Sequence, residues 1–77
     1  MNKRWWPKQP WEIVAEELDR LLEDLRAASA APAALQNPDV QRRVNETKIE
    51  FLAIRWAASQ WGYHTHDHVS EAWVRGI

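Results

Sequence analysis

The stretch that decides the fold is PDVQRRVNETKIEFLAIRWAASQWG, residues 38–62. Apolar and small residues recur in it at alternating spacings of three and four, which is the period of an α-helix. Asn37 can cap the first turn, Pro38 suits the first helical position, and Gly62 favours a left-handed stop. The sequence therefore predicts a long helix over residues 38–62. Its first apolar stripe consists of Val40, Val44, Thr47, Phe51, Ile54, Ala58 and Trp61.

The same helix carries a second apolar stripe on the side away from Phe51. Its members are Ile49, Leu52, Ala53 and Trp56. A hairpin of two helices covers only one of the two stripes, so the second stripe needs a third element, a second copy of the chain or a partner. We therefore assign these four residues to a third-helix or dimer face, and we expect the chain to pair into a dimeric helical bundle.

An amphipathic helix over residues 11–30 precedes this stretch. Pro10 suits its first turn, and Pro32 with small neighbours ends it near residue 30 and turns the chain back. The two helices can then zip together antiparallel, which makes the predicted fold an all-α helical hairpin. The apolar stripe of the first helix consists of Trp11, Val14, Leu18, Leu21, Leu22, Leu25 and Ala28.

A short third helix is predicted over residues 67–76, where apolar residues keep a helical period up to Ile77. Either Asp67 or Thr65 can cap its start. A helix of about three turns is marginal unless it docks. We expect Trp73 to hold it against the second stripe or against another chain.

Length and composition exclude several classes of protein. The chain has 77 residues, enough for one small domain, and no cysteine, which excludes disulfides and favours the cytoplasm. No apolar run reaches the roughly 20 residues of a membrane span. A net charge of -1, with acids concentrated in residues 12–24, disfavours nucleic-acid binding. No phosphate-binding loop or nucleophile elbow is present, so we do not expect an enzyme.

Six tryptophans gather near the two ends of the chain. Antiparallel pairing brings them to one end of the hairpin. They either tie residues 1–10, a basic Trp-rich arm, to a single helical domain in residues 11–77, or they stay exposed as a contact surface. The predicted partner-binding residues at this aromatic end are Arg4, Trp5, Trp6, Trp73 and Arg75.

The segment KRWWPKQPW, residues 3–11, is cationic and rich in tryptophan and proline. In composition it resembles Trp/Pro-rich antimicrobial peptides such as indolicidin. The resemblance implies weak contact with an anionic membrane surface, worth about 1 kcal/mol per positive charge.

The first helix carries an acidic face opposite its apolar stripe. Such a face is usually solvated, and arginines one turn away moderate its charge. The alternative is that it meets a basic partner, and for this role we select Glu16 and Glu23.

The segment HTHDH, residues 64–68, places three histidines at alternate positions. In an extended segment His64, His66 and His68 would point the same way and could bind zinc, nickel or copper. In a helix only the first and last would share a face. The simpler alternative is that they fill the connection before a helix capped by Asp67.

These features predict a small non-enzymatic protein–protein interaction module, an adaptor or inhibitor of a size often encoded by phages and mobile elements. It would dock through its aromatic end or its acidic helix face, and it would form a homodimer. The alternative function is metal binding by the histidine cluster.

Overall fold

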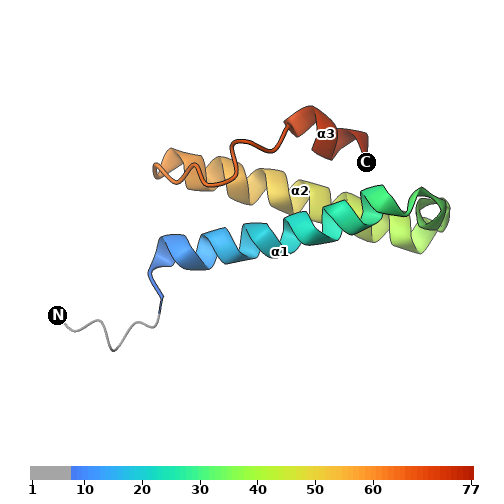
Figure 1. The fold of residues 1–77 in the computed structure, drawn as a ribbon, viewed down its shortest axis with the longest axis horizontal. Helices are drawn as coiled ribbons and strands as arrows, with labels where there is room; N and C mark the ends of the chain where they lie inside the picture. Colours follow the sequence, from blue (N-terminus) through green and yellow to red (C-terminus); the bar gives the residue numbers. More distant parts are fainter. Residues whose placement is uncertain (1–7) are drawn as a thin grey trace.

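The computed structural model describes residues 8–77, which contain three α-helices, one 3-10 helix and no strand. The elements are α1 (Pro10–Ala30), η2 (Pro32–Gln36), α2 (Pro38–Gln60) and α3 (Glu71–Gly76). α1 and α2 lie antiparallel and side by side, and α3 follows after an irregular segment (Figure 1). The predicted helical hairpin with a short third helix is confirmed. None of the helices in residues 8–77 is long and apolar enough to cross a membrane.

α1 begins where the sequence predicts. The backbone N–H of Gln9 donates to the Glu12 carboxylate at 2.9 Å, so the acid satisfies a donor next to the helix start. Pro10 takes the first helical position, where no backbone donor is needed.

The connection between α1 and α2, predicted as a turn near Pro32, contains a 3-10 helix. Pro32 cannot continue α1 but starts the 3-10 helix η2. The Oδ1 atom of Asn37 then accepts a hydrogen bond from the backbone N–H of Asp39 at 2.9 Å. The predicted cap of the second helix is therefore present.

The core lies between the two long helices and extends to the end of the chain. α1 supplies four leucines, and Phe51 of α2 is fully buried between them and the C-terminal residues. Full burial of one such side chain contributes about 1.5–3 kcal/mol. The buried cluster consists of Leu18, Leu21, Leu22, Leu25, Phe51, Val69 and Val74.

α2 ends at Gln60, earlier than the predicted residue 62. Gly62 has a φ of +87°, the left-handed conformation that the sequence predicts for the stop. The backbone N–H of Tyr63 donates to the carbonyl of Ala58 at 2.9 Å and closes the turn. The chain then reverses along α2 (Figure 1). We call residues 64–77 the strap.

Two cations of α2 hold the strap. Nη1 of Arg55 donates to the carbonyl oxygens of His66 and Val69, and Nζ of Lys48 donates to the carbonyl of Arg75 at 3.1 Å. Both cations lie on one side of α2, so the strap follows that side. α3 consequently lies away from the open end of the hairpin, where α1 begins and α2 ends (Figure 1).

The predicted cap of the third helix is wrong, and so is the prediction that Trp73 holds this helix against the second stripe. The cap is Ser70, whose Oγ accepts from the backbone N–H of Trp73 at 3.2 Å, instead of Asp67 or Thr65. The helix docks through Val74, which is fully buried, whereas Trp73 is 37% exposed. Contact of Trp73 with another chain stays a prediction.

Candidate protein-interaction surface

α2 meets a different environment on each side of its axis. Its buried side packs on α1 through Phe51 and Ala58. Helical spacing divides the remaining residues into three further sides. The strap side holds Lys48, Leu52 and Arg55, the outer side holds Ile49, Ala53 and Trp56, and the bare side holds Glu50, Ala57 and Trp61.

The predicted third-helix or dimer face is divided between two of these sides. Leu52 packs against the core beside the strap. Ile49 and Trp56 are 68% and 66% exposed, and Ala53 between them is exposed as well. The strap therefore covers only one edge of this face. Its role in a dimer stays a prediction.

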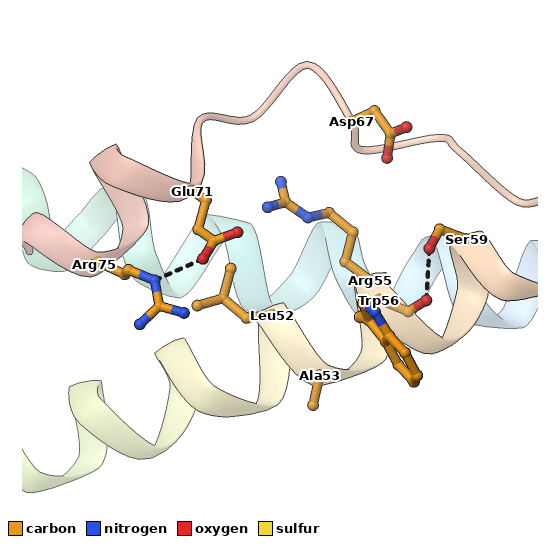
Figure 2. A pocket seen from close by; sticks show the side chains of 8 residues that line it. All are labelled: Leu52, Ala53, Arg55, Trp56, Ser59, Asp67, Glu71 and Arg75. Atoms are coloured by element: carbon orange, nitrogen blue, oxygen red, sulfur yellow. Dashed lines mark hydrogen bonds and ion pairs between the residues drawn. The ribbon is translucent and has the colours of Figure 1, made fainter.

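A groove of about 390 Å³ lies between α2 and the strap (Figure 2). Apolar atoms of Leu52 and Trp56 line this groove. The charged side chains beside them form hydrogen bonds with other groups of the same chain. Nε of Arg75 donates to the Glu71 carboxylate at 2.7 Å, and Arg55 is held by the strap carbonyls. The lining residues are Leu52, Ala53, Arg55, Trp56, Ser59, Asp67, Glu71 and Arg75.

A second groove, of about 440 Å³, lies at the open end of the hairpin on the bare side of α2, and we call it the open-end groove. Among residues 8–77, no residue beyond Tyr63 and no charged side chain lines it. Trp61 at its edge is 79% exposed. A contiguous apolar surface with an exposed large ring is typical of a contact site. The lining residues are Pro10, Val14, Ile54, Ala57, Ala58, Trp61 and Tyr63.

The bare side continues on α1 through Ile13, Glu17 and Arg20, which follow one another at helical spacing. Ile13 is 56% exposed. Arg20 pairs with Glu17 at 2.6 Å, and this hydrogen bond and charge lower the pKa of Glu17. The pKa of Arg20 is raised, first by Glu17 and more weakly by Asp24 and by Glu50 of α2. The bare side is therefore apolar at the open end and charged further along.

The tryptophans of the described residues do not form a closed aromatic core. Trp11 and Trp61 lie exposed at the open end, as the antiparallel pairing predicts. Trp73 lies on α3, away from that end, and lines neither groove. Arg4, Trp5 and Trp6 fall outside the described residues, so their predicted contact role is untested.

The acidic face of α1 is partly neutralised within the chain. Glu16 pairs with Nζ of Lys8 at 2.6 Å, and Asp19 accepts a hydrogen bond from His66. Glu23 is exposed. The predicted contact role of Glu16 and Glu23 stays a prediction, and neither residue lines a groove described above.

His66 is a buried structural residue. Its Nε2 lies 2.6 Å from Oδ1 of Asp19, and its Nδ1 lies 2.7 Å from Oγ1 of Thr65. Its ring meets the Phe51 ring edge to face, with 6.1 Å between the ring centres. Both ring nitrogens therefore have partners, and the ring fills space beside the core.

The other two histidines have separate surroundings. Nδ1 of His64 lies 2.8 Å from Oδ2 of Asp67, and the His68 ring stacks on the His66 ring at 6.0 Å. The segment forms turns, which is neither of the geometries expected to direct the imidazoles to one ion. Within residues 8–77 no group of three or more His, Asp or Glu side chains is arranged to hold a metal ion. Metal binding gains no support from this arrangement.

The bare side was not anticipated as a candidate site. Helical spacing places Ile54 and Trp61 in the first apolar stripe, which predicts that both face α1. The sequence does contain a signal for the bare side. Ala57 lies one helical turn from both residues and makes the stripe wider than one facing helix can cover.

In comparisons with known proteins, no family model, no curated protein and no solved structure matches this chain. Its function is therefore inferred from its own geometry.

Proposed function

We propose that this protein is a small non-enzymatic protein-interaction module, an adaptor or inhibitor, that docks through its open-end groove. The observation that carries the proposal is the apolar lining of this groove beside the exposed ring of Trp61. Burial of a tryptophan removes about 150–250 Å² from water. At about 25 cal/mol per Å², this supplies a few kcal/mol toward association, before the cost of immobilising the partners.

The chemistry of the groove favours a protein partner. Nucleic acids and anionic membrane surfaces are recognised through lysine and arginine side chains, and no such side chain of the described part of the chain lines this groove. A groove between two helices accepts the apolar face of a third helix, whose anchors repeat every three or four residues. The expected location is the cytoplasm, because the chain carries no cysteine.

A pair of matched variants tests the proposal. Ala57→Glu places a charge in the groove, whereas Ala53→Glu makes the same change on the outer side of the same helix. Both positions are exposed, so both variants should fold, which circular dichroism checks. Helical peptides selected from a displayed library for binding to the wild-type chain should bind Ala57→Glu at least about tenfold more weakly, a loss of about 1.4 kcal/mol. They should bind Ala53→Glu unchanged.

Two results would contradict the proposed function. One is that the selected peptides bind Ala57→Glu as tightly as the wild type. The other is that Ala53→Glu, and not Ala57→Glu, abolishes their binding, which would move the docking surface to the outer side.

A further inference from the structure

We infer that the occupant of the open-end groove is a second copy of this chain, and that two hairpins pair through their bare sides into a four-helix bundle. The inference rests on the proposed function, because it names the partner of the same groove. The bare side comprises Ile13, Glu17 and Arg20 on α1, Glu50 and Ala57 on α2, and Trp61, which caps the end of α2.

The strap leaves this side of the hairpin open. The contacts of the strap with α2 run through Lys48, Leu52 and Arg55, which lie across the helix from Ala57. Its contacts with α1 run through Asp19 and through the buried cluster that Val69 and Val74 share with the leucines of α1. The strap thus supplies a third layer on one side only. A hairpin with an apolar groove on the other side has the shape of half a four-helix bundle.

The charged half of the bare side is complementary to itself. Phe51 shares the buried cluster with Leu21 and Leu22, so its neighbour Glu50 lies at the level of Arg20 along the hairpin, and the two side chains interact electrostatically. A two-fold axis parallel to the hairpins sets α1 of one copy against α2 of the other. Arg20 of each copy then faces Glu50 of the other, and every helix has antiparallel neighbours.

The same two-fold axis places the apolar half of the bare side of one copy against the apolar half of the other. Pro10 and Val14 line the groove together with Ala57 and Trp61, so these residues also lie at the open end in both helices. The axis sets the exposed Ile13 of one copy against the Ala57 region of the other. An axis across the hairpins would instead set the groove against Arg20 and Glu50, and burial of these charges against apolar groups is costly.

The extent of the bare side also favours a second copy. A stable interface covers about 800 Å² on each partner. The outer side of α2 offers one row of side chains, whereas the bare side is two helices wide. A chain of this size buries only about 60% of its unfolded surface alone, so pairing adds burial that the monomer lacks.

Sedimentation equilibrium of the full chain tests the inference. The wild type should be dimeric at micromolar concentrations. Ala57→Glu should raise the dissociation constant at least about tenfold, equivalent to 1.4 kcal/mol. Ala53→Glu should leave it unchanged.

Charge reversal tests the direction of the two-fold axis. Arg20→Glu and Glu50→Arg should each weaken the dimer, because each variant sets like charges against one another. An equimolar mixture of the two variants should restore dimers at least about tenfold tighter than either variant alone. If Arg20 and Glu50 interact only within one chain, mixing the two variants should not tighten the dimer.

A wild type that stays monomeric at high micromolar concentration would overturn the inference, and so would a dimer that Ala53→Glu breaks and Ala57→Glu leaves intact. Mixing without any gain would overturn the proposed pairing. A different result contradicts the proposed function, namely that the selected peptides bind Ala57→Glu as tightly as the wild type. A monomeric chain whose peptides respond to that substitution identifies another protein as the occupant.

Discussion

Nε2 of the buried His66 lies 2.6 Å from Oδ1 of Asp19, which ties the strap to α1. Arg55 ties the same segment to α2 through the carbonyl oxygens of His66 and Val69. The strap therefore bridges both long helices on one side of the hairpin. Within the part of the chain that the structure describes, this asymmetry leaves the opposite side uncovered, and the proposed interaction surface is a consequence of it.

Loss of the carboxylate at Asp19 should destabilise the fold. Asp19→Ala leaves a buried imidazole nitrogen without its partner, and the free energy of unfolding should fall by roughly 1 kcal/mol. The estimate is at the low end of the range because Asp19 itself is 70% exposed and water can reach it. Urea unfolding measures the change. Glu23→Ala, at an exposed acid of the same helix, should have almost no effect, and an equal loss in both variants would exclude a specific role for the pair.

Loss of the guanidinium at Arg55 should release the strap. Arg55→Met keeps an unbranched apolar side chain but removes the guanidinium that lies over the Phe51 ring and donates to the carbonyls of His66 and Val69. Amide hydrogen exchange in residues 66–74 should become at least about tenfold faster, which corresponds to 1.4 kcal/mol of local stability. Arg43→Met, at an exposed position of α2, serves as the control. Unchanged exchange in Arg55→Met would mean that the apolar contacts of the strap suffice.

The Glu17–Arg20 pair should contribute to stability in a pH-dependent way. Arg20 lowers the pKa of Glu17 in the folded state below its ordinary value of 4.5. The contribution of this carboxylate is therefore fully present above the ordinary pKa and is lost as the pH falls through the lowered pKa. At neutral pH the wild type should have a higher melting temperature than Glu17→Gln, and this difference should vanish in acid. Thermal unfolding at several pH values measures it. If the difference in melting temperature persists in acid, it arises from packing of the Glu17 side chain and not from its charge.

Metal should not stabilise the fold through the histidine cluster. His66 is buried with both ring nitrogens within hydrogen-bond distance of protein oxygens, so a metal ion would have to break these contacts. Titration with zinc, nickel and copper should show no binding tighter than the high-micromolar range. Tighter binding that His64→Ala or His68→Ala removes would instead support the metal-binding alternative.

The hairpin could be predicted because its determinants are local. Asn37 with Pro38 begins α2, Gly62 ends it, and helical spacing places Leu18, Leu25 and Phe51 in the core. The path of the strap could not be predicted in the same way. It depends on contacts between distant residues, Asp19 with His66 and Arg55 with backbone carbonyls, and periodicity does not encode these contacts.

The same limit explains the errors around the tryptophans. Trp73 was expected to dock α3 because it is the largest apolar residue there, yet Val74 faces the core and Trp73 does not. Trp61 fits by spacing the stripe that faces α1, yet it is 79% exposed. Residue size and period predict which face is apolar, and they do not say which neighbour covers it.

Hydroxyl-radical footprinting across a concentration series tests the central claim most directly, because it reports the exposure of individual side chains. In dilute solution Trp61 and Trp56 should oxidise at similar rates, since both are mostly exposed. As the concentration rises through the micromolar range, Trp61 and Ile13 should become protected while Trp56 stays reactive. Protection of Trp56 with Trp61 unchanged, or no protection of either ring at any concentration, would contradict docking through the bare side.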